Sequence, residues 1–74
     1  MYQSHAQYAI SKAKYYIENP IFTTMLSSGV SCYQDALSLF SKGNFKNAID
    51  RAMDSLAYTV SKNHKDYIFL KNLS

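Results

Sequence analysis

The chain has 74 residues, of which 47% are hydrophobic and 18% charged, and its formal net charge is +3. A chain this short cannot build two cores, so we expect one domain over residues 1–74 with a small core of its own. The single cysteine, Cys32, excludes an intrachain disulfide framework and fits a reducing compartment, which predicts a cytoplasmic location. No apolar run approaches about eighteen residues, and residues 1–5 lack the features of a secretory signal, so we expect no membrane partner.

The first predicted element is a helix over residues 2–18. Its apolar residues recur at the helical spacing of three or four positions: Tyr2, Ala6, Ala9, Ile10, Ala13 and Ile17. The pair Asn19-Pro20 ends it, because the residue before a proline is disfavoured in the α conformation. We expect Asn19 to cap the next helix, with Pro20 at its first position.

The second predicted helix covers residues 21–42. Its main apolar stripe has the same period: Phe22, Met25, Leu26, Gly29, Val30, Tyr33, Ala36, Leu37 and Phe40. Residues 23–24 and 27–29 are poor helix formers, so a loop over 27–29 followed by a helix from Val30 is an alternative. Cys32 lies one position off the stripe and is expected to be an inert, buried core residue.

The third predicted helix covers residues 45–70 and follows a tight turn. Gly43 suits the left-handed position after a helix, and Asn44 suits the N-cap of the next one. A turn this short makes the two helices antiparallel. The third helix either runs through His64 or breaks near Asn63-His64 and starts again. On the outer faces we expect i,i+4 ion pairs between Lys46 and Asp50 and between Lys62 and Asp66.

These elements predict an all-α fold, an antiparallel three-helix bundle with helices at about 2–18, 21–42 and 45–70. No segment shows the alternation of a strand, and no hairpin dipeptide is present. Alanines on the apolar faces allow the helices to approach closely, and the aromatic side chains fill the remaining gaps.

Nothing in the sequence has the pattern of a catalytic, cofactor or metal site. His5 and His64 lack metal-ligand spacing, and we expect them to be exposed or capping, with His64 pairing only loosely with Asp66. Cys32 has no local base that would activate it. Asp50 and Asp54 lie at i,i+4, but they are expected to form a solvated face beside Arg51 and Lys46. The sequence therefore predicts a protein that is not an enzyme, with no catalytic residue, cofactor or metal.

The aromatic content is the most unusual feature, with seven Tyr and four Phe. So many rings cannot all lie inside a domain of this size, and tyrosine suits half-buried positions at interfaces. The expected partner-binding residues are Tyr8, Tyr15, Phe22, Tyr58 and Tyr67. They predict a small helical interaction module that acts as an accessory subunit or scaffold in a larger complex, docking on a larger protein or on itself.

The alternative function is that of a nucleic-acid-associated factor. Tyr67 and Phe69 are interleaved with Lys62, Lys65 and Lys71 near the end of the chain, and lysines with stacking aromatics suit single-stranded nucleic acid. The other basic residues are spread along the sequence, which is more typical of solvated helix faces than of a nucleic-acid footprint.

The hairpin region resembles three groups of helical proteins. It is similar to the tetratricopeptide repeat at Gly43, Phe45 and Ala48, but Ser55 and Val60 depart from that pattern. A single hairpin also excludes a stacked array. It most resembles a family of short archaeal helical domains of unknown function, through these positions: Tyr33, Asp35, Ala36, Phe40, Lys42, Gly43 and Ala48.

The segment 48–58 is similar to the HEPN superfamily of nucleotide- and RNA-associated helical domains. Nucleases of that superfamily need an arginine followed four to six residues later by a histidine. Arg51 has no such histidine, because His64 is too far along the chain. The resemblance therefore implies the helical hairpin and does not imply nuclease activity.

Overall fold

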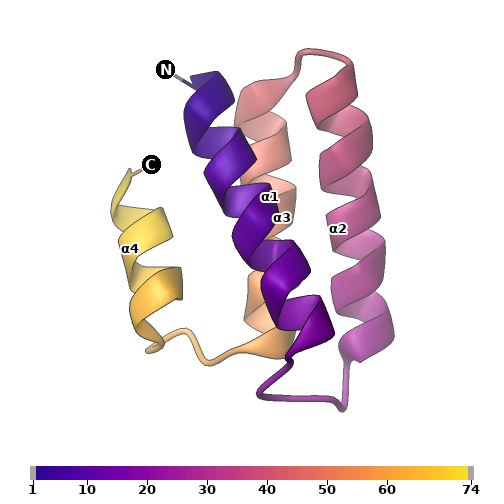
Figure 1. The fold of residues 1–74 in the computed structure, drawn as a ribbon, viewed down its shortest axis with the longest axis vertical. Coiled ribbons are helices and arrows are strands. Elements are labelled where there is room, and N and C mark those ends of the chain that lie inside the picture. The colour runs from indigo at the N-terminus through magenta and orange to yellow at the C-terminus, as the bar shows by residue number, and fades with distance from the viewer. Residues whose placement is uncertain (1, 74) are drawn as a thin grey trace.

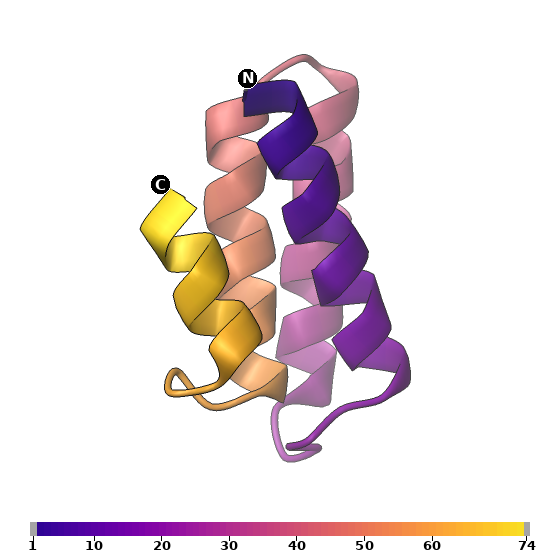
Figure 2. The same ribbon diagram turned by 60° about the vertical axis from the view of Figure 1, so that its left-hand side comes forward.

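The computed structural model describes residues 2–73, which form four α-helices and no strand (Figure 1). The helices are α1 (Tyr2–Glu18), α2 (Leu26–Ser41), α3 (Phe45–Thr59) and α4 (Lys65–Leu73). The all-α prediction is confirmed, but the prediction of three helices is wrong. The first three helices form an up-down-up bundle, and the short α4 lies against α1 and α3 (Figures 1 and 2).

The helix predicted over residues 21–42 begins only at Leu26. The backbone N–H groups of Ile21 and Phe22 both donate to the carbonyl oxygen of Thr59, at 3.0 Å each, so this segment is hydrogen-bonded to the end of α3. The predicted cap at Asn19-Pro20 is also wrong. The backbone and side-chain amides of Asn19 donate back to the carbonyl oxygen of Tyr15, at 2.8 and 3.1 Å. Asn19 therefore closes α1 and does not open α2.

The helix predicted over residues 45–70 is interrupted, as the alternative near Asn63-His64 proposed. The backbone turns to an extended conformation at Val60, where φ is −136° and ψ is 164°. Val60 is buried, so the chain leaves α3 in order to place this side chain in the core. A turn follows, in which the His64 N–H donates to the Ser61 carbonyl oxygen at 2.9 Å, and α4 then begins at Lys65.

A loop over residues 27–29, the other alternative, is not present, because Gly29 lies inside α2. Gly29 is buried against α3, and a Cβ atom there would lie 3.2 Å from Thr59 Cγ2. The Ser55 hydroxyl donates to the Gly29 carbonyl oxygen at 2.7 Å. This glycine is therefore needed for the close approach of α2 and α3, which compensates for its low helix propensity.

The α2–α3 turn has the predicted backbone geometry. Gly43 has a φ of +78°, in the left-handed region that favours glycine. Asn44 occupies the N-cap position of α3, but its side chain forms no capping hydrogen bond. The two helices are antiparallel neighbours, as expected.

The core consists of small residues from α1, α2 and α3 around a few larger side chains. The fully or almost fully buried apolar residues are Ala6, Ala9, Ala13, Ala36, Ala48, Ile49, Ala52, Leu56, Val60 and Leu70. Alanines at these positions let the helices pack closely, as the sequence predicts. The molecule measures 31 × 23 × 14 Å. The first turn of α1 and the last turn of α4 both lie toward the end that holds the α2–α3 turn (Figure 1).

Gly29→Val is expected to lower the free energy of unfolding by about 1–3 kcal/mol, because its side chain would overpack the contact with Thr59. Chemical denaturation measures this change. Ser31→Val is the control, since it places the same β-branched residue on an exposed position of α2 and should change stability by less than about 0.5 kcal/mol. Equal losses in the two variants would contradict the packing role of Gly29.

Candidate interaction surface

Four large apolar side chains gather at the end of the bundle opposite the α2–α3 turn. Ile21, Phe22, Met25 and Tyr58 are between 37% and 54% exposed. Together with Thr23, Thr24 and Ala57 they line one shallow, open groove. We call these four residues the apolar end surface.

The backbone explains why these side chains stay outside the core. Ile21 and Phe22 come before the first residue of α2, and their backbone N–H groups are hydrogen-bonded to Thr59. Their side chains therefore do not join the packed face of α2. Tyr58 lies on α3 between Ala57 and the buried Thr59. Three of the four side chains thus come from the α1–α2 connection and one from the last turn of α3.

A charged edge borders the apolar end surface. A second groove shares Ala57 and Tyr58 with the first and continues to Arg51 and Lys62. Arg51 forms ion pairs with two carboxylates, Asp35 at 3.0 Å and Asp54 at 2.9 Å. The hydrogen bond that the Arg51 guanidinium donates to Asp35 Oδ2 raises the pKa of Arg51. Lys62 is exposed and forms no ion pair within residues 2–73.

Cys32 lines this second groove, but its side chain is buried. Burial raises the pKa of the Cys32 thiol, and the nearby Arg51 opposes that shift only in part. The thiol therefore stays protonated near neutral pH, which is the state of an unreactive cysteine. Its predicted place in the core is confirmed.

The five predicted partner-binding residues do not form one surface. Phe22 and Tyr58 meet at the apolar end surface. Tyr8 packs edge-on against Phe69 of α4, with the ring centroids 5.7 Å apart. Tyr15 packs edge-on against its neighbour Tyr16, and Tyr67 is half-buried against the main core.

The sequence reasoning missed Ile21 and Met25 as surface residues. It assigned the segment to a helix, and a helical stripe would have turned Met25 toward the core. The available signal was the weak helix propensity of Thr23-Thr24 directly after Pro20. Together with residues 27–29 it weakens the front half of the predicted helix, but it does not by itself place Ile21 and Met25 on the surface.

The lysines of the alternative function are exposed but separated. Lys62 borders the groove beside Tyr58, whereas Lys65 and Lys71 lie in the first and last turns of α4. Because Lys65 and Lys71 are six residues apart on one helix, their side chains point in directions that differ by about 120°. Tyr67 packs on the core and is not free to stack with a base.

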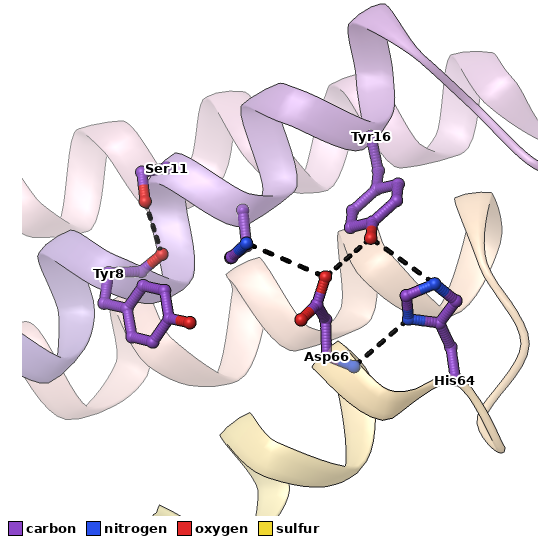
Figure 3. A network of polar contacts seen from close by, with 6 residues as sticks. Tyr8, Ser11, Tyr16, His64 and Asp66 are labelled. Atoms are coloured by element: carbon purple, nitrogen blue, oxygen red, sulfur yellow. Dashed lines mark hydrogen bonds and ion pairs between the residues drawn. The ribbon is translucent and has the colours of Figure 1, made fainter.

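A polar network joins α4 to α1 (Figure 3). The Tyr16 hydroxyl donates to Asp66 Oδ2 at 2.6 Å, and Lys12 Nζ lies 3.7 Å from the same oxygen. The backbone N–H of Asp66 donates to His64 Nδ1 at 3.1 Å, and His64 Nε2 lies 3.4 Å from the Tyr16 hydroxyl. His64 is therefore a capping histidine, which is one of the two roles expected of it.

Two of the predicted polar pairings are wrong. Asp66 pairs with Lys12 of α1 and not with Lys62, because the break after Val60 removes the i,i+4 relation. Lys46 and Asp50 form no ion pair.

His5 is half-buried, so the expectation that it is exposed is wrong, and it lines a small pocket together with Tyr2, Lys46, Ile49 and Asp50. Its Nε2 atom is buried and has no hydrogen-bond partner among residues 2–73.

The hydrogen bond between Tyr16 and Asp66 shifts the pKa of both groups. It raises the pKa of Tyr16 to about 12, with further contributions from burial and from the Asp66 charge. The same bond lowers the pKa of Asp66, and Lys12 adds to this effect while burial opposes it. The network is thus most stable with a neutral phenol and an ionised carboxylate.

Within residues 2–73, no three His, Cys, Asp or Glu side chains come together in a way that could hold a metal ion. None of the four helices described is both long and apolar enough to cross a membrane.

No protein-family model, curated protein or solved structure matches the chain. The resemblance of the hairpin region to short archaeal helical domains therefore stays a prediction.

Tyr16→Phe is expected to lower the free energy of unfolding by about 1.5–3 kcal/mol at pH 7, because it removes a hydrogen bond to a charged carboxylate. Tyr15→Phe is the matched control. Tyr15 is an adjacent tyrosine, more than half exposed, and its hydroxyl has no counterpart to the bond with Asp66. Urea denaturation measures both changes, and a similar loss in Tyr15→Phe would contradict the role of the network.

The same bond predicts a stability loss in alkali. The pKa of Tyr16 is about 12 in the folded protein and 10.0 is the ordinary value, so the unfolded chain loses the proton first. The contribution of Tyr16 is complete below pH 10 and falls as the pH rises toward 12. The difference in unfolding free energy between the unaltered protein and Tyr16→Phe should therefore narrow over this range. A difference in unfolding free energy that stays constant from pH 10 to 12 would contradict the raised pKa of Tyr16.

Proposed function

We propose that this chain is a small, non-enzymatic helical interaction module that docks on a larger protein through the apolar end surface. The observation that supports this most is the clustering of Ile21, Phe22, Met25 and Tyr58, each more than a third exposed, around one groove. Large apolar side chains that remain exposed together are typical of protein contact sites. A cytoplasmic location is part of the proposal, and the unpaired, buried Cys32 is compatible with it.

The charge of the chain favours a different protein over a second copy as the partner. Lys12 is the only lysine in an ion pair within residues 2–73, and the formal net charge is +3. Two copies meeting through the apolar end surface would bring both Lys62 side chains to one interface and add like charges. The partner we propose presents apolar side chains to the groove and a carboxylate to Lys62.

The nucleic-acid alternative has less support. It required Lys62, Lys65, Lys71 and Tyr67 to act on one surface, but the lysines point in different directions and Tyr67 packs on the core. The interaction module is therefore the function that we put forward.

The proposal predicts crosslinking from one side of the bundle only. A photo-reactive amino acid is placed at Phe22 in one form of the chain and at Leu37 in the other, and each is expressed in the cells that naturally make the protein. Leu37 is the matched control, since it is apolar and 42% exposed on α2. We expect a covalent adduct with one larger protein from position 22 and none from position 37. Adducts with only a second copy, or equal adducts from both positions, would contradict the proposal.

Substitutions then test the energetic role of the apolar end surface in the recovered complex. Phe22→Ala and Met25→Ala should each weaken binding by about tenfold or more, as truncation of a buried interface anchor does. Leu37→Ala should change the dissociation constant by less than about twofold. Isothermal titration calorimetry measures these constants, and circular dichroism verifies that each variant keeps its helices.

A further inference from the structure

The fourth helix is attached to the body of the protein by few side chains. Leu70 is the only residue of this nine-residue helix that is buried, with Tyr67 half-buried beside it. Ile68, Phe69 and Leu73 are all more than 40% exposed. So short a helix is not stable in water by itself, because its cost of nucleation is offset by few hydrogen bonds. Its position therefore depends strongly on the polar network at its first turn.

His64 holds that first turn as a hydrogen-bond acceptor. The N–H of Asp66, the second residue of α4, donates to His64 Nδ1 at 3.1 Å. This bond satisfies one of the N–H groups that a helix leaves free at its start. Since Nδ1 accepts, the single hydrogen of the neutral ring lies on Nε2 and faces the Tyr16 oxygen at 3.4 Å (Figure 3). Tyr16 in turn donates its own hydrogen to Asp66.

We propose that His64 is a pH-sensitive switch for the docking of α4: when Nδ1 gains a proton, the first turn of α4 loses its acceptor and the helix opens more often from α1 and α3. The protonated ring presents an N–H to the N–H of Asp66, so two donors face each other where a hydrogen bond had been. The new positive charge also lies at the positive end of the α4 dipole. Imidazole is the side chain that changes charge between pH 8 and 5.

Some of the groups around the His64 ring disfavour its protonated form, and one favours it. Lys12 of α1 and Lys65 of α4 are cations that disfavour a further positive charge, and Tyr16 is uncharged over this range. The carboxylate of Asp66 attracts the protonated ring, but its Oδ2 atom is engaged by Tyr16 and Lys12. At the end of α3 the one titratable group, Tyr58, lines the apolar end surface instead. The lost acceptor, the two cations and the α4 dipole all oppose the docked position, and the charge of Asp66 is the one attraction that favours it.

The titration of Asp66 is separate from this event. The pKa of Asp66 is below its ordinary value, so its carboxylate stays ionised at pH 5.5. A change in the amide protection of α4 between pH 7.5 and 5.5 is consequently due to protonation of a histidine and not of the Asp66 carboxylate.

Amide hydrogen exchange on the full chain, with each rate corrected for the intrinsic rate at the same pH, tests the proposal. We expect the protection factors of the amides in α4 to fall about tenfold from pH 7.5 to 5.5, which corresponds to the loss of one helix cap. The protection factors in α1, α2 and α3 should change by less than twofold. Protection in α4 that stays constant or rises in acid would overturn the proposal, as would an equal fall in all four helices.

Two matched variants assign the effect to His64. His64→Asn keeps an acceptor at the cap position and does not titrate, so protection in α4 should become independent of pH. His5→Asn removes the other histidine of the chain and should leave the tenfold change in place. A response that persists in His64→Asn, or that disappears in His5→Asn, would overturn the proposal. It stands apart from the proposed docking function, since neither variant alters the apolar end surface.

Discussion

The carbonyl oxygen of Thr59 accepts two backbone hydrogen bonds, from Ile21 and Phe22, and much of the architecture depends on this contact. It ties the α1–α2 connection to the last residue of α3, so three helices meet at one end of the bundle. It also delays the start of α2 to Leu26 and leaves Phe22 outside the core. Thr59 is itself fully buried, and its methyl group lies where a side chain at Gly29 would have to fit. One residue thus sets both the spacing of α2 and α3 and the geometry of the candidate interaction surface.

The helical period was enough to predict the fold class and the extent of α1, and Gly43 was enough to predict the turn between α2 and α3. In each case the signal is local, because alanine spacing and the conformational freedom of glycine need no knowledge of distant residues. The start of α2 could not be predicted in this way. Its apolar residues keep the helical period back to Phe22, but the backbone there forms long-range bonds to Thr59 instead of helical ones. The apolar period alone therefore predicts too early a start, since it contains neither these tertiary bonds nor the weak helix propensity of Thr23-Thr24.

The candidate site was predicted in part, for a related reason. Aromatic excess identifies a class of residue with exposed members, but composition does not say which of them share a face. Phe22 and Tyr58 are 36 positions apart in the numbering and meet only because the α1–α2 connection is bonded to α3. The polar network was not predicted, because partners for Asp66 and His64 were expected only among residues close to them in the sequence. Their decisive partner, Tyr16, comes from α1.

The arrangement of the helix ends has a practical consequence for anyone who handles this protein. The first turn of α1 and the last turn of α4 both lie toward the end of the bundle with the α2–α3 turn, away from the groove around Phe22 (Figure 1). A fluorophore, affinity tag or surface anchor attached to the first turn of α1 or to the last turn of α4 would lie away from that groove. The chain can therefore be immobilised by its ends with its apolar end surface facing the solution.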